Sequence, residues 1–216
     1  MKTIVKQNRT FLFLYLIFII IGAVLLISTT KHQLHLLFNQ FHNSFLDSFF
    51  YYATFLGDGI AAVLVVIMFL VVKYRIALIV AVSNLVAALI TQTLKHTIFD
   101  DVVRPKKFFE GIQDLYFVPG VENYMYNSFP SGHTTCAFAL YFSLALFTKN
   151  KWIELLLFSI ALIVGYSRVY LSQHFFVDIY AGSIIGVATT LLVYFLFRNL
   201  KAQWLDKSLI NSFNAN

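Results

Sequence analysis

The sequence has few charged side chains. Asp, Glu, Lys and Arg make up 12% of its 216 residues, hydrophobic residues make up 59%, and the mean hydropathy is +0.76. A soluble domain of this size carries about 25% charged residues. This scarcity excludes an ordinary soluble enzyme and indicates a single polytopic membrane domain over residues 1–216.

Cysteine is almost absent as well. The one cysteine, Cys136, excludes an intramolecular disulfide, and its place in an apolar run predicts a packing role. Acidic residues are fewer than basic ones, and the net charge is +6. Nucleic-acid binding could use such a charge, but basic residues flanking membrane helices explain it better, so we expect no nucleic-acid partner.

Six apolar stretches are predicted to cross a membrane, although the fifth is rather short. They cover residues 11–29, 52–72, 76–94, 131–148, 152–167 and 176–197. No small-residue cleavage site follows the first stretch, so we expect an uncleaved helix there. Residues 32–50 place apolar side chains three and four apart, which predicts one amphipathic helix in the membrane interface. The fold class is therefore predicted to be an all-α, six-transmembrane-helix bundle with an interfacial helix.

Three histidines, His32, His35 and His42, lie in the predicted interfacial helix. Their spacing is loose, and no cysteine or acidic cluster nearby completes a metal site. We therefore expect them to be solvated at the interface, and we expect no metal site.

Basic residues are distributed unevenly between the two sides of the predicted bundle. Six spans place both termini on one side, with ten basic residues there and six on the other. The positive-inside rule then puts both termini in the cytoplasm. The long segment 95–130, whose aromatic residues suit a lid at the lipid headgroups, shares the outer face with residues 168–174. We expect a bacterial inner membrane, with the site facing the periplasm or outside.

The segment from Ser167 to Asp178 collects polar side chains between two apolar runs. His174 and Asp178 are four residues apart, so they lie on one face if a helix begins near His174. The carboxylate can then accept the Nδ1 proton, which leaves Nε2 free as a base or nucleophile. Arg168 adds a planar fork suited to phosphate.

A second segment, Pro130-Ser131-Gly132-His133, has the composition of a helix start, where exposed N–H groups bind anions. Lys95, Arg104 and Arg168 could offset the charge of a phosphate monoester there. Only His174 has a carboxylate four residues later, which favours His174 as nucleophile and His133 as general acid. The roles of two residues stay open. Ser131 could contact the phosphate or serve as a helix cap alone, and Asp58 could lie at the active face or simply begin a helix.

These segments together resemble the three-part signature of the type 2 phosphatidic acid phosphatase superfamily: Lys95…Arg104-Pro105, then Pro130 to His133, then Ser167-Arg168-x5-His174-x3-Asp178. The resemblance implies hydrolysis without metal or cofactor through a phosphohistidine at His174, with His133 protonating the leaving group. It also implies a phosphate-binding set of Lys95, Arg104, Ser131, Gly132 and Arg168.

The first part of the signature departs from the family pattern. Eight residues instead of six separate Lys95 from Arg104. Two extra residues would turn a helix by about 200°, unless a looped segment absorbs them. Lys106 or Lys107 could therefore replace Lys95 at the phosphate.

The predicted function is a membrane phosphatase acting at the outer face on a lipid phosphate. Phosphatidate, phosphatidylglycerol phosphate, undecaprenyl diphosphate and lipid A phosphate all present an anionic head and a tail in the bilayer, so the sequence does not separate them. A non-hydrolytic lipid or anion transporter is the alternative. It does not explain two histidines at this spacing, and the predicted spans are unbroken, unlike transporter helices. Vanadium-dependent haloperoxidases have a similar site but are soluble. The oligomeric state stays open.

Overall fold

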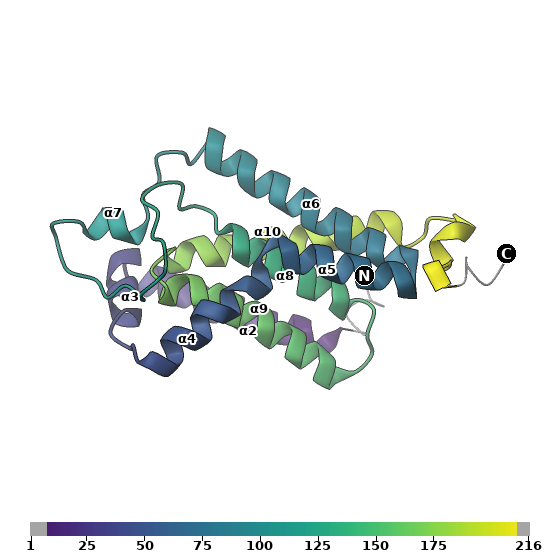
Figure 1. The fold of residues 1–216 in the computed structure, drawn as a ribbon, viewed down its shortest axis with the longest axis horizontal. Coiled ribbons are helices and arrows are strands. Elements are labelled where there is room, and N and C mark those ends of the chain that lie inside the picture. The colour runs from purple at the N-terminus through teal and green to yellow at the C-terminus, as the bar shows by residue number, and fades with distance from the viewer. Residues whose placement is uncertain (1–7, 211–216) are drawn as a thin grey trace.

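Helices account for all the regular structure among residues 8–210, which are the residues that the computed structural model describes (Figure 1). In chain order they are α2 (Arg9–Ser28), α3 (Lys31–Phe38), α4 (Ser44–Ala53), the 3₁₀ turn η1 (Thr54–Gly57), α5 (Gly59–Val72), α6 (Tyr74–Thr97), α7 (Pro105–Phe109), α8 (Gly132–Ala145), α9 (Lys151–Tyr170), α10 (Phe176–Phe197) and η2 (Gln203–Asp206). Lys2 and Lys6, which entered the predicted orientation, lie outside the described residues.

Four of these helices, α2, α6, α9 and α10, are long and apolar enough to cross a membrane. A fifth crossing is possible if the pair formed by residues 44–57 and 59–72 counts as one span, bent by 55°. Helix α8 has only 14 residues, and most of its side chains are buried. The all-α membrane bundle is confirmed, while the number of six spans is approximate because α8 is short.

The bend contradicts one step of the sequence argument. The argument against a transporter used unbroken spans, with Asp58 as the one interruption of the second span, but the helix there stops at Gly57 and restarts at Gly59. Asp58 between them has extended backbone angles (φ −75°, ψ 154°), so the helix cannot continue through it. The helices therefore no longer provide evidence against a transporter. The choice between a phosphatase and a transporter depends on the site geometry and on the related proteins.

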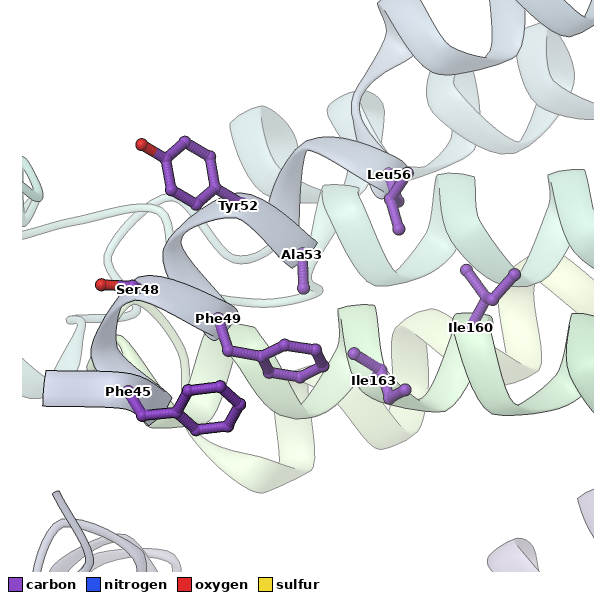
Figure 2. Close-up of a pocket in the computed structure, with 8 residues that line it drawn as sticks. All are labelled: Phe45, Ser48, Phe49, Tyr52, Ala53, Leu56, Ile160 and Ile163. Carbon is purple, nitrogen blue, oxygen red and sulfur yellow. The ribbon is translucent and has the colours of Figure 1, made fainter. Parts of the chain in front are cut away.

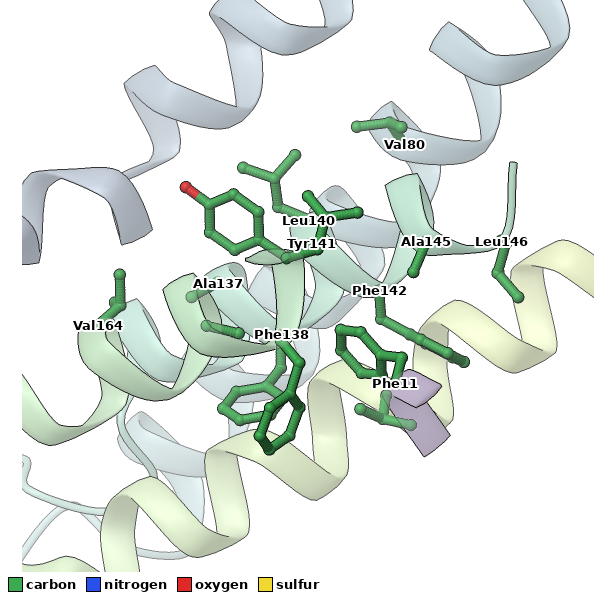
Figure 3. Close-up of a cluster of buried hydrophobic side chains, with 14 of the residues drawn as sticks. Phe11, Val80, Ala137, Phe138, Leu140, Tyr141, Phe142, Ala145, Leu146 and Val164 are labelled. Atoms are coloured by element: carbon green, nitrogen blue, oxygen red, sulfur yellow. The ribbon is translucent and has the colours of Figure 1, made fainter. Parts of the chain in front are cut away.

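Helix α8 lies at the centre of the bundle and carries much of its core (Figure 3). Phe138 and Phe142 of α8 are fully buried. Phe11 of α2 packs on Phe142 and on Phe158 of α9, with ring centroids 4.9 and 5.4 Å apart. Because lipid tails are themselves apolar, such close ring packing holds membrane helices together better than hydrophobicity does.

Two glycines let α10 approach α8 closely. A Cβ atom at Gly182 would lie 2.8 Å from the carbonyl oxygen of Ser131, and one at Gly186 would lie 2.6 Å from that of Thr135. Small residues at such positions allow backbones to touch. One result is a hydrogen bond of 3.0 Å from the Ser131 N–H to the Asp178 carbonyl, which joins two of the predicted motifs.

The predicted single amphipathic helix over residues 32–50 is wrong. The structure has two helices there, α3 and α4, separated by residues 39–43. Asn43 begins α4 by accepting a hydrogen bond from the Leu46 N–H at 2.9 Å. The Asn39 side chain bonds across to the backbone of Tyr116, at 2.9 Å to its oxygen and 2.8 Å from its nitrogen. Asparagine bonds of this kind compete with a continuous helix.

The expectation of solvated histidines is wrong for His35, while His32 and His42 are partly buried. His35 is fully buried, and its ring stacks on Phe109 at 5.9 Å between centroids. His32 stacks on Phe108 at 3.5 Å, and His42 lies 3.3 Å from Asp47 through Nδ1. Helix α7 and the loop after it cover this side of α3, which sequence periodicity alone does not reveal.

Candidate active site

Of the predicted pair, His174 lies in the turn between α9 and α10, and Asp178 lies in the first turn of α10. His174 Nδ1 lies 3.2 Å from Asp178 Oδ2, and both side chains are buried. The same oxygen accepts hydrogen bonds from the Phe175 N–H at 2.9 Å and the Ser128 hydroxyl at 2.5 Å. The carboxylate is thus fixed by three contacts, and it orients the imidazole so that Nε2 is the free nitrogen.

Burial lowers the pKa of His174 well below its usual value, and the positive charges of Arg104 and Lys95 add to this effect. The imidazole is therefore neutral at physiological pH. A neutral ring with an accepting partner at Nδ1 is the form in which Nε2 can attack an electrophile.

Arg168, in the last turn of α9, is buried beside this pair. Its Nη1 donates to the Thr54 hydroxyl at 2.6 Å, and its Nη2 donates to Gln173 Oε1 at 3.2 Å. Its Nε has no partner among the described residues. A guanidinium has five N–H groups, so Arg168 keeps more than half of them for another acceptor.

Arg104, from the first motif, lies next to Arg168 through their shared partner Gln173. Its Nε donates to the Tyr126 carbonyl at 2.8 Å and its Nη2 to the Asn127 carbonyl at 3.3 Å. Its Nη1 lies 3.1 Å from the carbonyl oxygen and 3.3 Å from Oε1 of Gln173. Burial lowers its pKa, and the charge of Asp178 partly offsets this. Arg104 thus supplies positive charge while it also fastens the loop over residues 110–131.

Lys95 is brought to the site despite the longer spacing of its motif. It lies in the last turn of α6, is buried, and donates from Nζ to the Asn127 carbonyl at 3.0 Å, the same oxygen that Arg104 contacts. The non-helical segment 98–104 absorbs the two extra residues. Lys106 is exposed, and Lys107 pairs with Glu110, so these lysines stay at the surface.

The second motif forms the start of α8. Ser131 is its N-cap, and the hydroxyl accepts hydrogen bonds from the Thr134 N–H at 3.5 Å and the Thr134 hydroxyl at 2.9 Å. The capping role is therefore present, whether or not Ser131 also meets a phosphate. Gly132 and His133 follow in the first turn, and both line a cavity.

That cavity, of about 570 Å³, lies between α5, α6 and α8. His133 and Asp58 line it together, so Asp58 both precedes α5 and shares a space with a predicted catalytic group. Its remaining walls are largely apolar and include Val63, Val66, Ile67, Leu85 and Ala88.

A second cavity has no connection to these residues. It lies between α4 and α9, has a volume of about 600 Å³, and is lined almost wholly by apolar side chains (Figure 2). Phe45, Phe49 and Ile163 are among them, and none of the predicted site residues lines it.

Sequence reasoning missed three residues that hold the site together: Thr54, Ser128 and Gln173. Each one hydrogen-bonds to a predicted site residue from a buried position. Gln173 directly precedes His174, and Ser128 lies two residues before Pro130. Their proximity to the predicted motifs in the sequence was therefore the signal that could have identified them. Thr54 lies more than a hundred residues from Arg168 and gave no signal.

All eight predicted site residues fall within residues 76–202, which match the family model described as PAP2 superfamily. The chain belongs to the PAP2 superfamily. This confirms the resemblance drawn from the three motifs. The PAP2 protein is thus an integral membrane protein and a phosphoric ester hydrolase.

Relatives of this PAP2 protein include lipid phosphatases. It is 30% identical to a lipid A 4'-phosphatase of Porphyromonas gingivalis, over 82% of this chain and 77% of that one. It is 33% identical to the undecaprenyl-diphosphatase BcrC of Bacillus subtilis, over 37% of this chain and 39% of the relative.

Two crystal structures share the fold of this PAP2 protein. LpxE of Aquifex aeolicus superposes with a TM-score of 0.67 at 24% identity, over 74% of this chain and 92% of that one. A PAP2-type phosphatidylglycerolphosphate phosphatase of Bacillus subtilis gives 0.64 at 21% identity, over 91% and 98%.

Proposed function

We propose that this PAP2 protein hydrolyses a lipid phosphate or a lipid diphosphate in the membrane, without a metal or cofactor, through a phosphohistidine on His174. The observation that supports a lipid as the substrate is the cavity between α5, α6 and α8. It begins at His133 and continues between apolar walls. A substrate whose phosphate lies at the histidines can thus place its hydrocarbon tail between α5 and α6.

In the first step, His174 Nε2 forms a bond to phosphorus while the bond from phosphorus to the lipid oxygen breaks. Arg168, with its free N–H groups, and Lys95 and Arg104 offset the charge on the phosphoryl oxygens. His133 gives its proton to the departing oxygen. The bound phosphate itself favours the protonated form of His133, because an opposite charge nearby stabilises the imidazolium.

In the second step, a water molecule attacks the phosphorus and the N–P bond breaks. His133 takes the proton of that water, and inorganic phosphate leaves. Throughout both steps, Asp178 Oδ2 accepts a hydrogen bond from the protonated Nδ1 of His174, which lies 3.2 Å away. The enzyme thus returns to its starting protonation state.

Among lipid phosphates we propose lipid A phosphate first and undecaprenyl diphosphate second. The lipid A 4'-phosphatase relative aligns over most of this chain, whereas the diphosphatase aligns over little more than a third. Phosphatidate and phosphatidylglycerol phosphate present the same anionic head and stay in the test.

We also propose that both termini face the cytoplasm and that the site faces the periplasm or outside. The basic residues Arg75, Lys149 and Lys151 support this, because they lie at or near the ends of α6, α8 and α9 that are opposite to the ends carrying the site residues.

The test measures phosphate release from these four lipids in detergent with a chelator present. Wild type is compared with His174→Ala and His133→Ala, and His96→Ala is the control because His96 is an exposed histidine. We expect release by wild type and the control, loss in both site variants, and no phosphoryl-enzyme in His174→Ala. If wild type releases phosphate from none of the lipids, or both site variants keep full activity, the proposal fails. Flux of lipid across vesicles without hydrolysis would instead favour a transporter.

A further inference from the structure

The Arg104 and Arg168 guanidinium groups meet at a single neutral acceptor, the side-chain oxygen of Gln173. Arg104 Nη1 lies 3.3 Å from this oxygen and Arg168 Nη2 lies 3.2 Å from it. All three side chains are buried. Two buried cations that converge on one point normally do so at a carboxylate, which would pair with both. An amide accepts both hydrogen bonds and leaves both positive charges in place.

The Gln173 amide cannot flip to exchange its oxygen and nitrogen, because the nitrogen also forms hydrogen bonds. Nε2 donates to the Glu122 carbonyl and, at 3.1 Å, to Asn123 Oδ1. These acceptors lie on the loop between α7 and α8, so the oxygen must face the arginines. One side chain thereby joins that loop to both cations.

The backbone on either side of Gln173 is fixed as well. Ser172 has a positive φ of 53°, and the N–H groups of Gln173 and His174 both reach the Arg168 carbonyl, at 2.9 and 3.0 Å. The Gln173 carbonyl accepts a hydrogen bond from Arg104 at 3.1 Å. The position of the amide is thus tied to that of the His174 ring.

We propose that Gln173 is a positioning residue, which holds Arg104 and Arg168 side by side with their charges uncompensated so that the substrate phosphate neutralises them. This inference rests on the proposed function, since it names the phosphate as the missing anion. Gln173 touches the arginines and not the reacting atoms. Its neutrality is the property that matters, because a carboxylate at this point would compete with phosphate.

The decisive variant is Gln173→Glu, which keeps the shape and adds one negative charge between the arginines. Binding of inorganic phosphate and of orthovanadate is measured by calorimetry on purified protein in detergent, alongside KM and kcat. We expect both anions to bind at least about tenfold more weakly and KM to rise more than kcat falls. Gln113→Glu is the matched control, because it adds the same charge on an exposed part of the loop.

A merely structural role gives a different pattern: a lower melting temperature and a smaller active fraction, with anion affinity unchanged in the folded protein. Anion affinity within twofold of wild type in folded Gln173→Glu overturns the inference. If that variant does not fold, Gln173→Met decides, since it is neutral and of similar length but accepts no strong hydrogen bond. We expect it to weaken anion binding at least about threefold, and unchanged binding overturns the inference.

Anion binding is measured without turnover, so the outcomes for the inference and for the proposed function are separate. Wild type that binds phosphate but hydrolyses no lipid contradicts the function alone. Wild type that hydrolyses lipid, with Gln173→Glu unchanged in anion affinity, contradicts the inference alone.

Discussion

At the scale of single residues, the Ser128 hydroxyl should matter for turnover. It donates to Asp178 Oδ2 at 2.5 Å, the oxygen that also faces His174 Nδ1. A hydrogen bond to a charged group contributes about 1.5–3 kcal/mol, so we expect Ser128→Ala to lower kcat by roughly tenfold to a hundredfold. KM should change little, because Ser128 touches no phosphate ligand. Steady-state kinetics on a lipid phosphate measure this, with the exposed Ser44→Ala as control.

His35 should make the fold sensitive to acid. Burial, with smaller contributions from His32 and His42, lowers its pKa from 6.5 to about 4. Between these values the unfolded chain binds a proton that the folded chain does not, so stability falls as pH falls through this window. We expect His35→Gln to remove up to about 3 kcal/mol of this dependence. Melting temperatures from pH 7.5 to 4.5 test it, and an unchanged slope in the variant contradicts it, with His96→Gln as control.

The residues that sequence reasoning found and missed differ in how far their contacts reach along the chain. His174 and Asp178 are separated by one helical turn, so their contact follows from spacing. Ser128 and Gln173 act through the loop over residues 110–131, which folds back on the α9–α10 turn. No periodic pattern describes such a loop, and its path is set by tertiary contacts. His35 was misjudged for the same reason, because residues of α7 cover it.

At the scale of elements, the close contact of α8 with α10 should set the geometry of the site. Gly186 lies where a Cβ would come within 2.6 Å of the Thr135 carbonyl. We expect Gly186→Leu to push the two helices apart, to lower the melting temperature by several degrees and to reduce kcat at least about tenfold, since α8 carries His133 and α10 carries Asp178, the partner of His174. Ile184→Leu is the control, because Ile184 is exposed on the same helix. A variant with normal kcat would show that the contact is not needed for alignment.

Helix prediction succeeded where apolar length alone decides and failed where polar side chains interrupt. The stretch 176–197 was predicted with the bounds that α10 has. Residues 32–50 carry the right apolar spacing, yet Asn39 and Asn43 bond elsewhere and break the helix. The bend at Asp58 is different, because the sequence already allows Asp58 to begin a helix and it does precede α5.

At the scale of the whole molecule, the orientation can be tested directly. The proposed arrangement places the C-terminus in the cytoplasm. A reporter that is active only in the cytoplasm should therefore be active when it is fused after Asn216. A cysteine introduced at the exposed Gln113 should react with an impermeant maleimide added from outside, whereas one at the exposed Lys149 should not. The single native cysteine, Cys136, is replaced by alanine first. The opposite labelling pattern would invert the proposed topology.

The cavity between α5 and α6 leads to the last prediction, which concerns substrate length. Ala88 lines this cavity from α6 and has an exposed side chain, so Ala88→Phe should fold while filling the path of the tail. We expect kcat/KM for a long-chain lipid phosphate to fall at least about tenfold, because the lost tail contacts contribute about 25 cal/mol per Å². A short-chain phosphate of the same headgroup should be hydrolysed at nearly the wild-type rate.

The control for this experiment comes from the other cavity. Ile160 lines the cavity between α4 and α9 (Figure 2), and Ile160→Phe adds bulk in that cavity, which His133 does not line. If Ile160→Phe impairs the long-chain substrate and Ala88→Phe does not, the tail lies between α4 and α9 instead. If Ala88→Phe slows long and short substrates equally, the effect is on the catalytic groups and not on the tail. Only selective loss of the long-chain substrate ties the α5–α6 cavity to the lipid.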